Sequence, residues 1–133
     1  MDWSKYPNFK QSEMACKCGC GFVNISKKLM DMLQKARTIA GIPFVINSAC
    51  RCLANNTKEG GSLASDHLAS KTKECFGVDI AVNGDRSAFI IERALIKAGF
   101  DRIGHYLDKS IIHAGIGKES GGTNDSRVRW VKR

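Results

Sequence analysis

The sequence predicts an α+β fold, in which a small antiparallel or mixed sheet is packed by two helices. Two segments carry apolar residues at helical spacing, and short segments typical of strands are interleaved with them. The chain has 133 residues, of which 43% are apolar and 26% are charged. These values favour a single globular domain over residues 1–133 and exclude a disordered tail, a collagen-like fibre and a coiled coil.

The first helix is expected after an irregular, cysteine-rich N-terminal wrap formed by residues 1–25, which show no sustained hydrophobic period. Ser26 is a suitable N-cap, Gly41 stands where a C-cap belongs, and Pro43 prevents the helix from continuing. This amphipathic helix is predicted by apolar residues at every third or fourth position: Leu29, Met32, Leu33, Ala36, Ile39 and Ala40.

Two strands are expected on either side of a long polar loop. Residues 43–48 predict a short buried strand, and residues 49–73 predict a loop of a length that is usually functional or mobile. Alternation along residues 76–82 predicts a second strand with Asp79 on the face that otherwise carries only small residues. The opposite face of this strand carries the apolar residues Val78, Ile80 and Val82.

The last third of the chain predicts a helix, a hairpin and a tail. Ser87 is expected to cap the second helix, which ends at Gly99. Residues 102–107 and 110–116 predict two short strands joined by a tight turn. Residues 117–133 form a basic tail, which begins rich in Gly and Ser and alternates near its end as an edge strand would.

The formal charge is +8, from 21 basic and 13 acidic residues. This balance suggests an anionic partner such as nucleic acid, a membrane surface or an acidic cell-wall polymer. We expect no membrane span, because no apolar run approaches the ~20 residues that one needs. The N-terminus lacks the apolar stretch of a secretory signal. We therefore expect the chain to be made in the cytoplasm. We also expect it to be a monomer.

Three histidines, His67, His105 and His113, are the first candidates for chemistry. Strand alternation places His113 beside the small residue Gly115 on an open face. His67, Asp79 and His113 would suit a catalytic zinc site, which takes three protein ligands and keeps a fourth position for water. A histidine in a strand is more often a packed core residue, so spacing alone leaves both interpretations open.

A series of short motifs supports the zinc interpretation. In chain order these are Asn47-Ser48-Ala49-Cys50-Arg51, Ser65-Asp66-His67-Leu68, Gly77-Val78-Asp79-Ile80, Ile103-Gly104-His105-Tyr106 and Ile112-His113. The series resembles the zinc D-Ala-D-Ala carboxypeptidase and L-alanyl-D-glutamate endopeptidase family, which shares a fold with the hedgehog signalling domain. The resemblance covers roughly residues 8–131, and the Cys-Lys-Cys-Gly-Cys-Gly segment is similar to small members from phages and their hosts.

The resemblance implies a hedgehog/DD-peptidase-like fold and a zinc peptidase that cuts peptidoglycan stem peptides. From the family pattern Ser-x-x-His-x-x-Gly-x-Ala-x-Asp and a later histidine, it implies a Zn²⁺ site with the ligands His67, Asp79 and His113. It implies that Arg51 orients the substrate and stabilises the developing oxyanion, a role that suits its permanent charge and forked donors. Ser65, two positions before His67 where the pattern has three, is matched to the serine of the pattern and, with Tyr106, is assigned to substrate binding.

Two departures from the family pattern lie close to the ligands. Eleven residues separate His67 from Asp79 where the pattern has six, so Ala69 to Glu74 are interpreted as an insertion that bulges outward. Small members of the family usually read His-x-Asp at the last ligand, whereas here the third position is Gly115.

A third departure concerns the general base. Members with an acid three residues before the last histidine use it as the base, and here that residue is Ser110. A peptidase that activates water needs a proton acceptor within hydrogen-bond reach. Asp108, Asp66 and His105 are the candidate substitutes, and metal binding is therefore better supported than turnover.

The cysteines form two clusters in the sequence. Cys16, Cys18 and Cys20 lie ahead of the first helix, whereas Cys50 and Cys52 flank the loop arginine between them. We expect a structural contact between these clusters rather than catalytic thiol chemistry. A disulfide, a second zinc ion and simple packing are the alternatives for that contact.

Three functions follow from these observations. The first is a zinc peptidase that acts on stem peptides at the bacterial cell wall, with a phage lysin as the expected setting, and its positive surface would hold it on an anionic wall polymer. The second is a metal-binding cell-wall-binding or virion-structural module of the same fold, motivated by Ser110 and Gly115. The third is a basic nucleic-acid binder, which is disfavoured because no helix-turn-helix, zinc-finger or aromatic RNA-binding signature is present.

Overall fold

The computed structural model describes all 133 residues and contains one five-stranded mixed sheet. The strand order is β1-β2-β4-β3-β5, and all neighbours are antiparallel except β3 and β5, which are parallel. The strands are β1 (Ile46–Ser48), β2 (Gly77–Ala81), β3 (Arg102–Tyr106), β4 (Ile111–Gly115) and β5 (Val128–Lys132). The predicted α+β class, the β3–β4 hairpin and the edge strand in the tail are thus confirmed.

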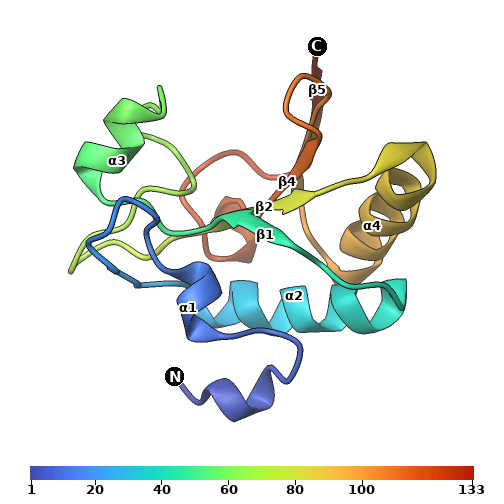
Figure 1. Cartoon of the computed structure of the whole chain (residues 1–133), viewed down its shortest axis with the longest axis horizontal. Helices are drawn as coiled ribbons and strands as arrows, with labels where there is room; N and C mark the ends of the chain where they lie inside the picture. Colours follow the sequence, from blue (N-terminus) through green and yellow to red (C-terminus); the bar gives the residue numbers. More distant parts are fainter.

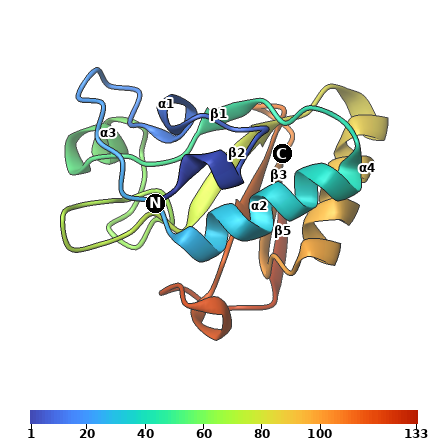
Figure 2. The same cartoon turned by 90° about the horizontal axis from the view of Figure 1, so that it is seen from below.

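Two long helices, α2 (Lys27–Ala40) and α4 (Gly84–Ala98), lie together on one side of the sheet (Figure 1 and Figure 2). Their apolar faces, the inner face of the sheet and buried residues of the N-terminal and loop segments form a core cluster of 27 buried residues. The predicted ends of α2 are confirmed, because Ser26 Oγ accepts from the backbone of Leu29 and Gly41 adopts a left-handed φ of 68°. Neither helix, nor any other in the chain, is long and apolar enough to cross a bilayer.

The prediction that Ser87 caps α4 is wrong by one turn. The helix begins at Gly84, with Asn83 at the N-cap position. Ser87 lies inside the first turn, where its hydroxyl accepts from the backbone of Asn83 and donates to the carbonyl of Gly84. The serine therefore closes the helix start from within.

Several short elements occupy segments that were predicted to be irregular. The N-terminal wrap contains a 3-10 turn, η1 (Trp3–Lys5), and a short helix, α1 (Gln11–Met14). The loop expected over residues 49–73 contains α3 (Leu53–Lys58), and the tail contains a second 3-10 turn, η2 (Lys118–Ser120). The strand expected at residues 43–48 is reduced to β1.

Small residues on the outer face of the sheet leave space above it for other side chains. Gly104 on β3 faces Trp130 on β5 so closely that an added Cβ would lie 2.3 Å from the indole ring. Figure 1 shows α3 and β5 on opposite flanks of the sheet, and residues following α3 and residues of β5 line a cavity of about 390 Å³ between them. The open face of the sheet forms the floor of this cavity.

Candidate metal centre

Three side chains meet at the floor of the cavity: His67, Asp79 and His113. One nitrogen of each histidine and a carboxylate oxygen of the aspartate all lie within 4.8 Å of one another, and all three residues are buried. Asp79 on β2 and His113 on β4 are direct cross-strand partners, so strand alternation brings both to the same face. The structure therefore brings together the three residues that the sequence analysis predicts as zinc ligands.

Both imidazole rings are oriented by a second acceptor. Nδ1 of His67 donates to the carbonyl of Ala49 at 2.7 Å, which leaves Nε2 3.1 Å from Oδ1 of Asp79. Nε2 of His113 donates to Asp66 at 2.8 Å, and its Nδ1 lies 3.0 Å from the same oxygen of Asp79. Metal-binding histidines usually have their other ring nitrogen held in this way, because it fixes both the ring and its tautomer. The donor set fits a divalent metal ion.

Asp66 is the buried carboxylate that positions His113. It also accepts from Nε of Arg102 at 2.9 Å and from Nδ2 of Asn124 at 2.8 Å. Burial opposes ionisation of Asp66, but the hydrogen bond and charge of His113, together with Arg102 and Asn124, lower its pKa to about 2. This aspartate was a candidate base in the sequence analysis, and its three hydrogen bonds instead make it a fixed support.

The room for Asp66 comes from Gly115. A Cβ at position 115 would lie 2.7 Å from Oδ2 of Asp66 and 3.0 Å from Nε2 of His113. The family's His-x-Asp pattern would therefore clash with this arrangement. Gly115 thus leaves space for Asp66, a carboxylate from a distant part of the chain, to reach His113.

The buried carboxylates and histidines of the site shift one another's pKa values. Burial opposes ionisation of Asp79, but the charges and hydrogen bonds of His67 and His113 hold its pKa below the usual range. Burial by itself lowers the pKa of His113, whereas its bonds to Asp66 and Asp79 raise it to about 9. The two carboxylates therefore favour positive charge beside them, which without a metal ion is a proton on His113.

Three further residues predicted for the site line the cavity: Arg51, Ser65 and Tyr106. Nη2 of Arg51 lies 3.5 Å from Oδ2 of Asp79, and its Nε donates to Ser48 at 3.1 Å. These contacts direct the guanidinium toward the metal ligands. The hydroxyl of Tyr106 accepts from Nε1 of Trp130 at 3.0 Å, which fixes the mouth of the cavity beside β5.

Two residues proposed as catalytic lie elsewhere. Gly104 and Tyr106 face the cavity, so alternation along β3 turns His105, which lies between them, to the opposite face of the sheet. Asp108 is exposed in the β3–β4 turn and does not line the cavity. The structure does not bring either side chain to the metal ligands.

The inserted residues Ala69 to Glu74 leave the ligands together. Ser70 and Lys73 exchange backbone hydrogen bonds across an exposed turn, while the ammonium of Lys73 donates to the carbonyl of Leu68. The backbone of Arg51 donates to the carbonyl of His67 at 2.8 Å and ties the loop that carries this ligand to the adjoining segment. The expectation of an outward bulge thus holds for the exposed residues of the insertion but not for Ala69, which is buried in the core and donates to the carbonyl of Arg51.

Sequence reasoning missed several residues on the walls of the cavity: Glu59, Arg102, Lys109, Asn124, Trp130 and Lys132. Glu59 caps the C-terminal end of α3, which was not predicted, and Trp130 reaches the cavity through the parallel pairing of β5 with β3. The available signal was the strand alternation of the tail, which places Trp130 and Lys132 on one face.

The cysteine contact differs from the prediction in one member. Cys52 meets Cys16, Cys18 and Cys20, but Cys50 is not part of this group. The side chain of Cys50 is buried in the core cluster, which also contains Cys75. Cys52 instead stands at the N-cap of α3, where its side chain meets the N-terminal turn.

Comparison with known proteins agrees with this geometry. The model of the peptidase M15 family matches residues 7–115, which include all three candidate ligands. No curated protein matches the chain. Peptidases of this family depend on zinc, and the group formed by His67, Asp79 and His113 is suited to hold it. The match spans most of the chain, which therefore belongs to the peptidase M15 family of zinc-dependent, D-Ala-D-Ala carboxypeptidase-like enzymes.

Proposed function

We propose that this chain is a zinc peptidase that cleaves the stem peptides of peptidoglycan at a D-Ala-D-Ala or L-Ala-D-Glu type of bond. The observation that carries the proposal is the convergence of His67 Nε2 and His113 Nδ1 on Asp79 at the floor of a cavity. A role as a phage lysin acting at the bacterial wall belongs to the same proposal. The charge of +8 would favour adsorption to an anionic wall polymer.

His67, Asp79 and His113 would hold the metal. Zinc bound there acts as a Lewis acid on the scissile carbonyl and lowers the pKa of a water molecule toward neutrality. Asp66 keeps His113 in the orientation that presents Nδ1, and the carbonyl of Ala49 does the same for Nε2 of His67. The chain thus supplies three ligands and leaves the cavity side for substrate.

The cavity walls suit a peptide that carries carboxylates. Arg51 lies beside Asp79, where its guanidinium can donate to the oxygen of the scissile carbonyl as negative charge develops. Arg102, Lys109 and Lys132 add cationic groups around the cavity. Stem peptides present free carboxylates next to the bonds in question, so this charge pattern favours them over neutral peptides.

For the proton acceptor we propose Glu59, an exposed residue that lines the cavity. The cavity is lined by three carboxylates, and two of them, Asp66 and Asp79, are engaged by histidine and arginine side chains. The carboxylate of Glu59 forms no hydrogen bond or ion pair with another side chain. We assign to it the transfer of a proton from water to the leaving amine. This assignment replaces His105 and Asp108 as candidates for the base.

A second function is favoured by Ser110. At this position, where relatives carry an acid, the residue adopts a left-handed φ of 52° and its carbonyl accepts from Val82. Ser110 is therefore a turn residue, and its side chain has no carboxylate that could act as a base. A module of the same fold that binds metal and wall fragments without cutting them, at the cell wall or in a virion, is the alternative.

One digest distinguishes the two functions. Purified peptidoglycan is incubated with the wild-type protein, with His113→Ala and with chelator-treated protein, and the soluble fragments are identified by mass. The peptidase proposal expects stem-peptide fragments that are absent from both controls, and their masses name the bond. Zinc-loaded wild-type protein that sediments with peptidoglycan but releases nothing would establish the binding module instead.

A further inference from the structure

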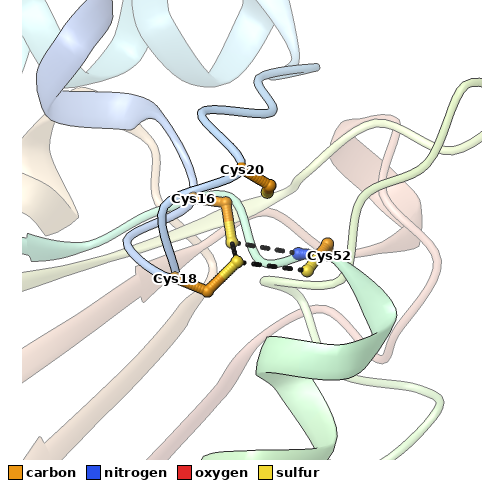
Figure 3. A group of neighbouring side chains, drawn as sticks. All are labelled: Cys16, Cys18, Cys20 and Cys52. Atoms are coloured by element: carbon orange, nitrogen blue, oxygen red, sulfur yellow. Dashed lines mark hydrogen bonds between the residues drawn. The ribbon is translucent and has the colours of Figure 1, made fainter.

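A second group of metal-ligating side chains lies outside the cavity. Cys16, Cys18 and Cys20 come from the turn that follows α1, and Cys52 comes from the N-cap of α3 (Figure 3). Their four sulfur atoms all lie within 4.8 Å of one another, although Cys52 is far from the others in sequence. All six cysteines of the chain are free thiols. Nothing in the peptidase chemistry uses this group.

The spacing of the sulfurs matches a tetrahedral thiolate site. Four sulfurs bound to zinc at about 2.3 Å would lie about 3.8 Å from one another. The distance from Cys18 Sγ is 3.5 Å to Cys16 Sγ and 3.7 Å to Cys52 Sγ. A disulfide would instead bring two sulfurs to about 2.05 Å. The observed contacts therefore correspond to the edges of a metal–thiolate tetrahedron.

Backbone and amide donors surround the same sulfurs. The backbone N–H of Cys52 and the side-chain amide of Asn55 both donate to Cys16 Sγ, each at 3.4 Å. The backbone N–H of Asn55 donates to Cys52 Sγ, also at 3.4 Å. The side chain of Asn55 is buried, so this contact is part of the packed structure. Donors of this kind stabilise thiolates and orient them toward a metal.

We propose that Cys16, Cys18, Cys20 and Cys52 bind a second zinc ion in a closed, four-cysteine structural site. Soft thiolate ligands in tetrahedral arrangement select zinc over harder divalent cations such as magnesium or calcium. All four positions are filled by protein, so this ion has no place for water or substrate. The site is structural and does not take part in peptide cleavage.

The site joins two segments that border the cavity. Cys52 directly follows Arg51 and begins α3, which ends beside Glu59. On the other side, the backbone of Cys50 donates to the carbonyl of Met14 at 3.1 Å, so the N-terminal segment already contacts this loop. A metal bridge from the Cys16–Cys20 turn to Cys52 would hold the loop of Arg51 and the start of α3 in place.

Cobalt substitution tests this proposal independently of peptidase activity. The reduced, metal-free chain is titrated with Co²⁺, which gives thiolate-to-cobalt charge-transfer absorption only when cysteine sulfur is a ligand. We expect the wild-type chain to bind two cobalt ions, one of them with this absorption. Cys18→Ser should bind one ion fewer and lose the absorption, because Cys18 makes both short sulfur contacts.

Two variants serve as matched controls. His113→Ala should keep the full charge-transfer absorption, which separates this site from the cavity and from the proposed peptidase activity. Cys50→Ala removes a thiol two residues from Cys52 without touching the group and should also keep the absorption. Should Cys18→Ser fail to fold, the wild-type spectrum alone decides the matter.

The proposal is overturned if the reduced wild-type chain shows no thiolate-to-cobalt absorption. It is equally overturned if peptide mapping of freshly isolated protein finds disulfides among Cys16, Cys18, Cys20 and Cys52. A wild-type chain that gives the cobalt spectrum but cleaves no peptidoglycan would count against the proposed function alone.

Discussion

The two groups of metal-ligating side chains are held by different kinds of structure. His67, Asp79 and His113 lie on the open face of the sheet, where two of the three belong to paired strands and every ring nitrogen has a partner. The four cysteines instead come from a turn and a helix cap, and two of them, Cys18 and Cys20, are exposed. One group is therefore held mainly by the sheet, whereas the other is held by contacts between a turn and a helix cap, which a bound metal ion would reinforce.

From this difference we assign catalysis to the histidine–aspartate group and a structural role to the cysteine group. Three nitrogen and oxygen ligands on a rigid floor leave room for substrate on the cavity side, as a catalytic site requires. Four sulfur ligands drawn from separate segments close around an ion and exclude substrate. The comparison predicts that damage to the first group abolishes turnover, while damage to the second mainly loosens the structure.

The largest effect short of removing a metal ligand is expected for Glu59→Gln. Loss of a general base typically lowers the rate about 10²–10⁴-fold, and zinc content should not change. Asp108→Asn is the matched control, because this carboxylate lies in an exposed turn away from the cavity, and its kcat should equal that of the wild type. The reverse pattern, with Asp108→Asn inactive and Glu59→Gln active, would restore Asp108 as the base.

Arg51→Lys should lower kcat on the order of 10²-fold, the usual cost of losing one donor to a developing oxyanion. Lysine keeps the charge but cannot reach both Ser48 and the substrate oxygen, as the forked guanidinium does. Steady-state kinetics with a synthetic stem peptide measure the effect. An unchanged kcat with a raised KM would show that the arginine only binds the substrate.

Asp66→Asn is expected to weaken zinc binding by roughly 10–100-fold, because it removes the carboxylate that orients His113. Gly115→Ala should act in the same direction, since the added Cβ would lie 2.7 Å from Oδ2 of Asp66. Zinc affinity is measured by competition with a chromophoric chelator. Wild-type affinity in both variants would show that His113 needs no support from Asp66.

Cys18→Ser should have the smallest effect on turnover, less than about tenfold, because Asp79 and His113 are held by paired strands and His67 by its bond to the carbonyl of Ala49. The melting temperature of this variant should be lower than that of the wild type. Added zinc should raise it only by the amount that binding at the histidine–aspartate group provides. Thermal unfolding in the presence and absence of zinc checks both points. A fall in turnover as large as that of Glu59→Gln would place the cysteine group within the catalytic machinery.

Local patterns were sufficient for α2 and for the two strands that carry Asp79 and His113. Ser26 and Gly41 mark the ends of α2 because capping is decided by a few neighbouring residues. Strand alternation placed Asp79 and His113 on an open face, and their cross-strand pairing follows from the order of the sheet. These features depend on short stretches of chain, which sequence reasoning handles well.

Features that depend on long-range contacts were missed or misplaced. α3 has no apolar period and begins where the sulfur of Cys52 accepts from Asn55, so only the folded cysteine group reveals it. His105 was assigned to the cavity although its neighbour Gly104 is the residue opposite His113. Asp66 reaches His113 across 47 positions of sequence, a contact that no local pattern encodes.

The most direct test of this account compares three proteins in one assay: the wild type, His113→Ala and Cys18→Ser. Each is loaded with zinc, its bound metal is counted, and the stem-peptide fragments released from peptidoglycan are quantified by mass spectrometry. We expect both variants to bind one zinc ion fewer than the wild type, with fragments absent from His113→Ala and retained by Cys18→Ser. Fragments released by His113→Ala at the wild-type rate would contradict the assignment of catalysis to the histidine–aspartate group.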